Sequence, residues 1–241
     1  MSSVFLKNIA VNDIWQPFLN SSITGLLKEI ESQISGRPYT PCTDKVLRFL
    51  EFPLHEAKVV ILGQDPYPQE GAATGRAFEV GDLTTWEQSF RNISLKNILR
   101  AVYKAYTGEI ISYSNLKEKL KSDFPVLPPG ELFVHWEKQG VLLLNTSFTC
   151  EPGYPGSHKQ LWKNFTAKLL NFINQKADGA VWFLWGNHAA EASGGIELKN
   201  AISMMHPMMC YDNPSRPADF LYGDINCFER LIPAIDWTGY S

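Results

Sequence analysis

The sequence predicts an α/β fold in three layers, with a central, mainly parallel four-stranded sheet between two layers of helices. Four short, mainly apolar runs, the first of them rich in β-branched residues, each stop at a glycine or a polar residue, as strands buried on both faces do. Segments with helical spacing of apolar residues alternate with these runs. That alternation is typical of right-handed βαβ units, which build a parallel sheet.

The four strands are predicted from these apolar runs, at Val59–Leu62, Val141–Leu144, Ala180–Trp185 and Ile202–Met205. Polar or flexible residues follow each one, and among them are Asp65, Asn145, Gly186 and His206. The carboxyl ends of parallel strands meet at one edge of a sheet, where the ligand crevice of open α/β folds lies. The sequence therefore predicts that these four residues converge on one pocket.

Helices are predicted before, between and after the strands. The first has an apolar stripe from Leu26 to Ile34 and ends at Gly36. A short second helix is predicted near Pro41, with Val46, Leu47 and Leu50 facing inward, and a third is opened by residues 89–93, with Ile93 on its apolar face. The later helices are predicted at Glu131–Gln139, at the segment carrying Trp162 to Ile173, from Gly186 to about Leu198, and around Asp224–Ile232. Residues 106–130 are polar, contain three prolines and predict a surface excursion.

The composition predicts one globular domain over residues 1–241. A net charge of −3 means that any nucleic-acid site must be a local basic patch. The four cysteines are scattered, which indicates a reducing compartment, the cytoplasm or the nucleus of a eukaryote. We expect no signal peptide and no membrane span, because no run of about 18 apolar residues occurs.

The common cofactor and metal motifs do not occur in this sequence. We found no H-E-x-x-H, no H-x-E with a paired C-x-x-C, no P-loop, no G-x-G-x-x-G after the first strand and no G-x-S-x-G. We therefore expect neither a metal nor a cofactor. This leaves chemistry by ordinary side chains.

Three polar residues at the predicted edge are the main candidates for that chemistry. Asp65 can act as a general base or a fixed negative charge, or simply cap a turn before Pro66. Asn145 can read a ligand through its amide, or form a turn. His206 can be an acid, an electrophile, a metal ligand or a structural residue. Their convergence favours the functional interpretation of all three.

The segment Gln64-Asp65-Pro66-Tyr67, followed by Gly75-x-Ala77-Phe78, resembles the water-activating motif of the family-1 uracil-DNA glycosylases. The resemblance extends, in the family's order, over roughly residues 40 to 237. It includes the segments 142–146 (LLLNT), 157–159 (SHK), 183–186 (FLWG) and 206–207 (HP).

The resemblance implies hydrolysis of the N-glycosidic bond between uracil and deoxyribose, after the base has been extruded from the helix. Asp65 would stabilise the cationic sugar and position the water, and His206 would hydrogen-bond the uracil oxygen. Asn145 would pair with the N3–H and O4 edge. The remaining pocket contacts would be the Gln64 main-chain N–H, Tyr67 against a thymine methyl group and Phe78 stacked on the base; the alternative for both rings is core packing.

The implied partner is uracil-containing DNA, single- or double-stranded, with free uracil as product and the protein a monomer. The DNA contacts would come from Ser89, Gly186, Asn187, Pro207, Met208 and Met209. Arg76, Arg91 and Lys159 would supply local positive charge, or be solvated surface charges. The sequence does not tell whether a protein inhibitor or a replication partner binds.

The sequence departs from the family pattern at several positions. Pro68 stands where the family has His, and the segment before Trp162 is one residue shorter. After His206, Met208 replaces a phosphate-binding serine, Cys210 replaces a leucine wedge, and residues 212–217 form an apparent insertion. We expect Met208 or Met209 to act as the wedge, with weaker base extrusion or a preference for single strands. Two alternatives stay open: a uracil-DNA-binding module with little turnover, and a glycosylase of shifted base specificity.

Overall fold

The computed structural model of the protein describes residues 3–240. Its centre is a four-stranded sheet of β1 (Val59–Gly63), β2 (Val141–Asn145), β3 (Val181–Trp185) and β4 (Ala201–Met204), in the order β2-β1-β3-β4. All three strand pairs are parallel, which confirms the predicted α/β class. All five residues of β1 are buried, which explains why its sequence is continuously apolar rather than alternating.

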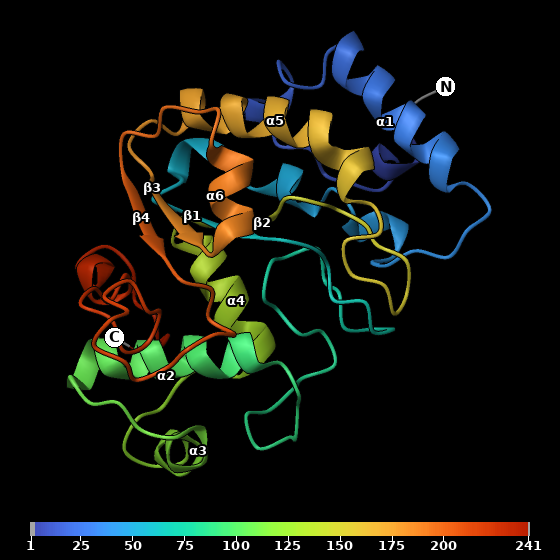
Figure 1. The fold of residues 1–241 in the computed structure, drawn as a ribbon. Coiled ribbons are helices and arrows are strands. Elements are labelled where there is room, and N and C mark those ends of the chain that lie inside the picture. The colour runs from blue at the N-terminus through green and yellow to red at the C-terminus, as the bar shows by residue number, and fades with distance from the viewer. Residues whose placement is uncertain (1–2, 241) are drawn as a thin grey trace.

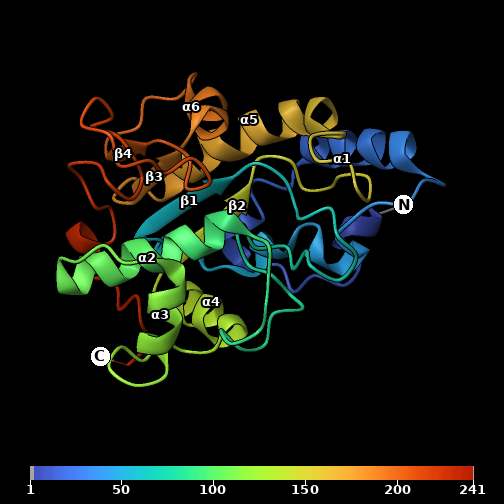
Figure 2. The same ribbon diagram turned by 60° about the horizontal axis from the view of Figure 1, so that its bottom comes forward.

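Two hydrophobic cores lie on opposite faces of the sheet. Val59 and Ile61 point into the core built with α2 (Ile93–Thr107), α4 (Pro129–Lys138) and the C-terminal segment. Val60 and Leu62 point into the other, built with α1 (Ser21–Ile34) and α5 (Lys159–Lys176). Figures 1 and 2 show α1 and α5 on one side of the sheet and α2 and α4 on the other. The three-layer arrangement follows from these two cores.

Several helices agree with the sequence prediction. Asn20 caps α1 by accepting hydrogen bonds from the N–H groups of Ser22 and Ile23. The helix ends at Ile34, and Gly36 follows with φ +75°. The short helix expected near Pro41 is instead a pair of 3₁₀ turns, Thr43–Lys45 and Arg48–Glu51. The inward residues Val46, Leu47 and Leu50 are buried as predicted.

Other boundaries were wrong. The excursion at 106–130 contains a helix, α3 (Tyr113–Leu120), because the Ser112 hydroxyl caps it and Leu116 is buried beneath it. The helix after β3, α6 (Asn187–Ser193), stops at Gly194 rather than near 198. The last helix is only a 3₁₀ turn, Glu229–Leu231, and Asn226 Oδ1 accepts the N–H groups of Phe228 and Glu229 at its start. Ile93 opens α2 but faces solvent.

Two further observations concern the residues that the structure describes. The four cysteines are free thiols. Within residues 3–240, no helix combines the length and the apolar character that crossing a bilayer requires.

Candidate active site at the carboxyl edge of the sheet

The pairing of β1 with β2 continues past the ends of both strands. The Thr146 N–H donates to the Gly63 carbonyl at 3.0 Å, and the Ser147 N–H donates to the Gln64 carbonyl at 2.9 Å. Asn145 lies directly opposite Gly63, and a Cβ atom at Gly63 would stand 2.4 Å from Asn145 Oδ1. Only glycine leaves room for this amide. Asn145 is therefore held against the residue that precedes Gln64 and Asp65.

Asp65 lies in the loop after β1, partly buried. Its carboxylate accepts hydrogen bonds from the Gln64 side chain and the Gly156 N–H. Burial raises the pKa of Asp65, and these hydrogen bonds and the charges of His188 and Lys159 oppose the rise. Atom Oδ1 is buried without a hydrogen-bond partner among the described residues. A buried acceptor in that state is suited to a water molecule or a ligand group.

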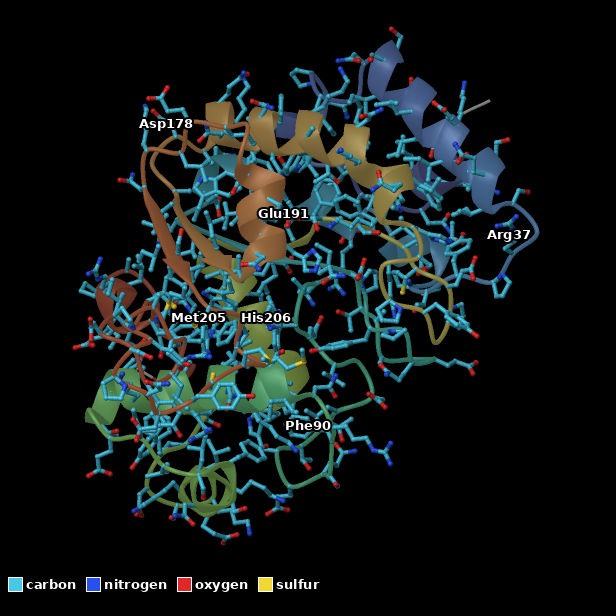
Figure 3. The ribbon with its side chains drawn as sticks, in the orientation of Figure 1. Arg37, Phe90, Asp178, Glu191, Met205 and His206 are labelled. Carbon is cyan, nitrogen blue, oxygen red and sulfur yellow. The ribbon has the colours of Figure 1, made fainter. Side chains whose placement is uncertain are left out.

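His206 follows β4 and lies between α6 and α2 (Figure 3). The Met208 N–H donates to its Nδ1 at 3.2 Å, so in the neutral ring the proton is on Nε2. Burial lowers the pKa of His206, and the charge of His188 lowers it further. The imidazole is therefore a neutral hydrogen-bond donor through Nε2 near pH 7.

Gly186 makes room for that imidazole. It connects β3 to α6 with φ +84° and ψ 177°, and its N–H donates to the Met204 carbonyl at 2.8 Å. A Cβ atom at Gly186 would lie 2.8 Å from His206 Cβ and 3.3 Å from Cδ2. The ends of β3 and β4 thus approach each other in a way that only glycine permits.

Phe78 completes one wall of the site. Its φ is +66°, which is rare for a residue with an aromatic side chain and marks local backbone strain. Its ring centroid lies 5.2 Å from that of Trp185 and 6.3 Å from that of His206. The Ala77 N–H donates to the Leu143 carbonyl at 3.3 Å, which fixes this loop to β2.

Arg76 anchors the same loop and is buried. Its guanidinium pairs with Glu79 at 3.1 Å and with Glu137 on α4. Arg76 is therefore not available to a DNA phosphate, and that expectation was wrong. The long-range partner Glu137 could not be read from the sequence.

The loop of Tyr67 crosses the loop that follows β2. The Gly153 N–H donates to the Pro68 carbonyl at 3.0 Å, and the Cys150 thiol contacts the Pro66 carbonyl at 3.5 Å. The phenol oxygen of Tyr67 is buried beside the Asn92 side chain, and burial raises the pKa of Tyr67 to about 12. The phenol is therefore a rigid, neutral wall rather than an acid.

The loop after His206 is held in place at several points. Asn97 on α2 donates to the Pro207 carbonyl at 2.6 Å. Buried Asp219 accepts the Tyr211 N–H at 2.9 Å and pairs with Arg216 at 3.0 Å. The Arg216 guanidinium also bonds the Met209 carbonyl and lies 4.8 Å from the Tyr211 ring centroid. Met208 and Met209 stay exposed, by 54% and 46%, on this fixed loop.

The remaining predicted DNA contacts are placed as follows. Ser89, Arg91 and Asn187 are exposed, and Pro207 is buried. Exposed Lys159 donates to His188 Nδ1 at 3.2 Å. Two groups that act on the site were not predicted from the sequence: His188, whose charge acts on both Asp65 and His206, and the Gly156 N–H, which acts on Asp65. The positions of both groups depend on how distant loops fold back on the carboxyl edge of the sheet. In the sequence, only the place of His188 directly after Gly186-Asn187 indicated a role at the site.

Residues 49–225 match the profile of the Uracil DNA glycosylase superfamily. This range covers more than half of the chain and includes every residue of the edge described above. The chain belongs to this superfamily. Its family membership confirms the resemblance drawn from the motifs.

Curated relatives and solved structures of the superfamily agree with this assignment. The chain is 35% identical to Uracil-DNA glycosylase 1 of Listeria innocua, over 76% of each protein. It is 38% identical to Uracil-DNA glycosylase of Pseudoalteromonas translucida, over 81% of this chain and 77% of the relative. The wild-type UNG crystal structure from Nitratifractor salsuginis has the same fold, with a TM-score of 0.66, 26% identity and coverage of 83% and 85%.

Proposed function

We propose that this protein is an active uracil-DNA glycosylase that hydrolyses the N-glycosidic bond of uracil in DNA and leaves an abasic site for base-excision repair. The observation that carries the proposal is the placement of the Asp65 carboxylate, the Asn145 amide and the His206 imidazole at one edge of the sheet, in a chain of this superfamily. The names of the curated relatives support the same activity.

The reaction requires a carboxylate on one side of the sugar and a donor at the departing base. Breaking the C1′–N1 bond leaves a cationic sugar and a uracil anion. Asp65, in its ionised form, stabilises the cation and orients a water molecule, whose oxygen then bonds C1′ while its proton passes to the carboxylate. The Nε2–H of His206 donates to the uracil oxygen on which negative charge develops. One such donor lowers the barrier by roughly 3–4 kcal/mol.

Base selection follows from the Asn145 amide. Its amide makes no hydrogen bond to another side chain among the described residues and is held by contact with Gly63, so both its donor and its acceptor can serve a base. Uracil offers N3–H and O4, whereas cytosine offers the reverse pattern there. A buried mismatch of that kind can reject an analogue by about 10⁴-fold or more.

The rest of the base pocket comes from the loop after β1. Phe78, fixed beside His206, offers a face on which the ring can stack. Tyr67 occupies the space that a thymine methyl group needs, and the Gln64 main-chain N–H supplies a further contact. The buried, unionised phenol suits Tyr67 to steric exclusion.

DNA contacts are proposed at the exposed rim of the site. Ser89 and Asn187, with the backbone of Gly186 and Pro207, would bind phosphates. Met208 or Met209 would enter the base stack, because both side chains are exposed on a loop that Arg216 and Asp219 hold in shape. An apolar side chain on a braced loop can act as a wedge.

A uracil-DNA-binding module with little turnover is the second candidate, favoured by the replacement of serine and leucine in this loop with Met208 and Cys210. Oligonucleotides with one uracil, single- or double-stranded, test both candidates through alkaline cleavage at abasic sites. Release by the wild type and its loss in Asp65→Asn support the enzyme. Tight uracil-dependent binding without cleavage would select the module, and cleavage at another base alone would select a shifted specificity. Asn145→Asp should gain release of cytosine.

The remaining attributes are proposals of the same kind. The four unpaired cysteines support a reducing compartment inside the cell. We further propose that the protein acts as a monomer and releases free uracil. A solved structure of mimivirus UNG Y322F in complex with UGI shares the fold at TM-score 0.62. A titration of uracil release with UGI would test whether such an inhibitor acts on this chain.

A further inference from the structure

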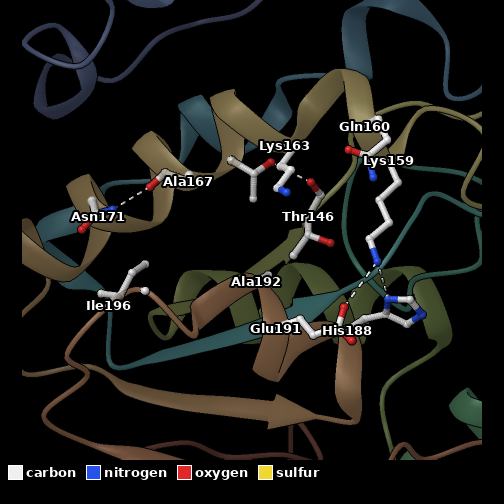
Figure 4. Close-up of a pocket in the computed structure, with 12 residues that line it drawn as sticks. Thr146, Lys159, Gln160, Lys163, Ala167, Asn171, His188, Glu191, Ala192 and Ile196 are labelled. Atoms are coloured by element: carbon white, nitrogen blue, oxygen red, sulfur yellow. Dashed lines mark hydrogen bonds and ion pairs between the residues drawn. The ribbon is translucent and has the colours of Figure 1, made fainter.

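A separate cavity opens beside the candidate active site, between α5 and α6 (Figure 4). Its volume is about 480 Å³, within the usual range for small-molecule sites. Thr146, the residue after Asn145, lies in its wall, whereas Asp65, Asn145 and His206 do not line it. The cavity therefore adjoins the proposed uracil site without being part of it.

The part of the cavity lined by Lys159, Lys163 and Glu191, which we call its mouth, carries two cations and one carboxylate. Lys159 and Lys163 lie one helical turn apart on α5, and both line the cavity. Lys159 pairs with Glu191 at 3.5 Å, but the Lys163 ammonium group has no hydrogen-bond or ion-pair partner among the described residues. In a chain of net charge −3, this unpaired cation is a local feature that favours an anionic ligand.

His188 joins the mouth of the cavity to the catalytic edge. Its Nδ1 lies 3.2 Å from the Lys159 ammonium nitrogen (Figure 4), and its Nε2 can donate a hydrogen bond to a ligand. The charges of His188 and Lys159 also act on Asp65. His188 and Lys159 therefore lie near enough to Asp65 to contact a strand whose uracil is bound there.

The rest of the lining, which we call the wall, is suited to a flat ring. Its small residues Ala167, Ala192 and Gly195 are exposed or half-buried, and no atom lies within 4 Å of a Cβ atom built at Gly195. Ile196 adds an apolar surface, and Asn171 adds an amide. A nucleotide combines the two chemistries that the cavity offers, an anionic phosphate for the mouth and a flat base with polar edges for the wall.

We propose that this cavity holds a nucleotide that flanks the uracil in the same strand, with its phosphate at Lys159 and Lys163 and its base against the small apolar residues. The proposal rests on the proposed function, because the uracil at Asp65 is what brings the strand to the cavity. The unpaired Lys163 is the group expected to contribute most, since it gives up no partner on binding.

A matched pair of variants tests the cavity. Lys163→Gln removes the unpaired charge at the mouth, and Lys168→Gln removes an equally exposed charge on the same helix that does not line the cavity. The readout is KM for uracil-containing single strands that are extended one nucleotide at a time on either side. We expect KM to fall when the added nucleotide reaches the cavity, and Lys163→Gln to abolish that fall, a loss of roughly fivefold, with kcat unchanged. Lys168→Gln should retain it.

A second measurement separates the cavity from catalysis. Binding of a uracil-free single strand, followed by fluorescence anisotropy, should show a salt slope smaller by about 0.7 in Lys163→Gln, the value of one lost phosphate contact. Ala192→Leu, which fills the wall, should weaken binding while retaining the salt slope. If the wild type binds uracil-containing strands without releasing uracil and these contrasts appear, the hydrolytic function fails and the binding of a flanking nucleotide in the cavity stands. Equal behaviour of Lys163→Gln and Lys168→Gln in both assays, or binding of free dTMP with no effect of strand length, would overturn the cavity proposal.

Discussion

Replacing Gly186 with alanine tests how closely the fold positions the His206 imidazole. The backbone at Gly186 has φ +84° and ψ 177°, a region that is essentially restricted to glycine and costs about 1–3 kcal/mol for other residues. The new methyl group would also stand 2.8 Å from His206 Cβ and 3.3 Å from its Cδ2. Contacts that short force the ring to move.

Both consequences can be given a magnitude. We expect the free energy of unfolding to fall by about 1–3 kcal/mol from the backbone alone. A misplacement of about 1 Å in a catalytic group can cost roughly 10²-fold in rate. Complete loss of one donor costs about 10²–10³-fold. We therefore expect kcat for uracil release to fall roughly 100-fold, short of the loss in His206→Ala.

Urea denaturation and uracil release measure the two effects, with Gly108→Ala as control. Gly108 also has a positive φ, +75°, but no atom lies within 4 Å of a Cβ atom built there. That control should lose stability, by about 1 kcal/mol, and retain kcat. In a His206→Ala background, Gly186→Ala should lower kcat little further. An unchanged kcat in Gly186→Ala, or additive losses in the double variant, would refute the idea that Gly186 acts through the imidazole.

Four other substitutions have expected outcomes. Asp65→Asn should raise the free energy of unfolding at pH 7. Folding raises the pKa of Asp65, so its carboxyl group lowers stability as the pH rises above the pKa of the unfolded chain. A lower unfolding midpoint in urea would contradict this. His188→Asn removes a positive neighbour that lowers the pKa values of Asp65 and His206. The acid limb of the pH profile of kcat/KM should therefore move to higher pH, and an unchanged acid limb would contradict this prediction. Arg76→Ala leaves the buried Glu79 and the partly buried Glu137 without their cation and should cost roughly 3 kcal/mol in chemical denaturation. A loss under about 1 kcal/mol would show that the carboxylates find other partners. Met209→Ala should lower uracil release from duplex DNA and spare single strands; equal rates on both would rule out a wedge at this position.

Local sequence patterns were sufficient to predict the sheet and its active edge. The run Val59–Leu62 is unambiguous because every residue in it is buried, and β1 extends it by a single residue, Gly63. The placement of Asp65, Asn145 and His206 at the same edge of the sheet followed from strand direction alone. These predictions depend on the periodicity of apolar residues and on the polar residues that follow each strand, and both can be read directly from the sequence.

What could not be predicted depends on contacts between segments far apart in the chain. Ser112 caps α3 in a stretch whose prolines suggested only a loop. Arg76 finds Glu137, 61 positions later, and so leaves the surface. The Gly156 N–H reaches Asp65 only because the loops after β1 and β2 cross. The spacing of residues along the sequence does not indicate such contacts between distant loops.

The hydrogen bond between the Met208 N–H and His206 Nδ1 couples two events in the proposed reaction. The side chain of Met208 is exposed where the proposed DNA strand would contact it, while the Met208 N–H bond to Nδ1 keeps the imidazole proton on Nε2. A strand that pushed this residue out of position would also release Nδ1 and make the other tautomer available. Correct seating of the DNA and readiness of the imidazole to receive the leaving base thus depend on the same peptide.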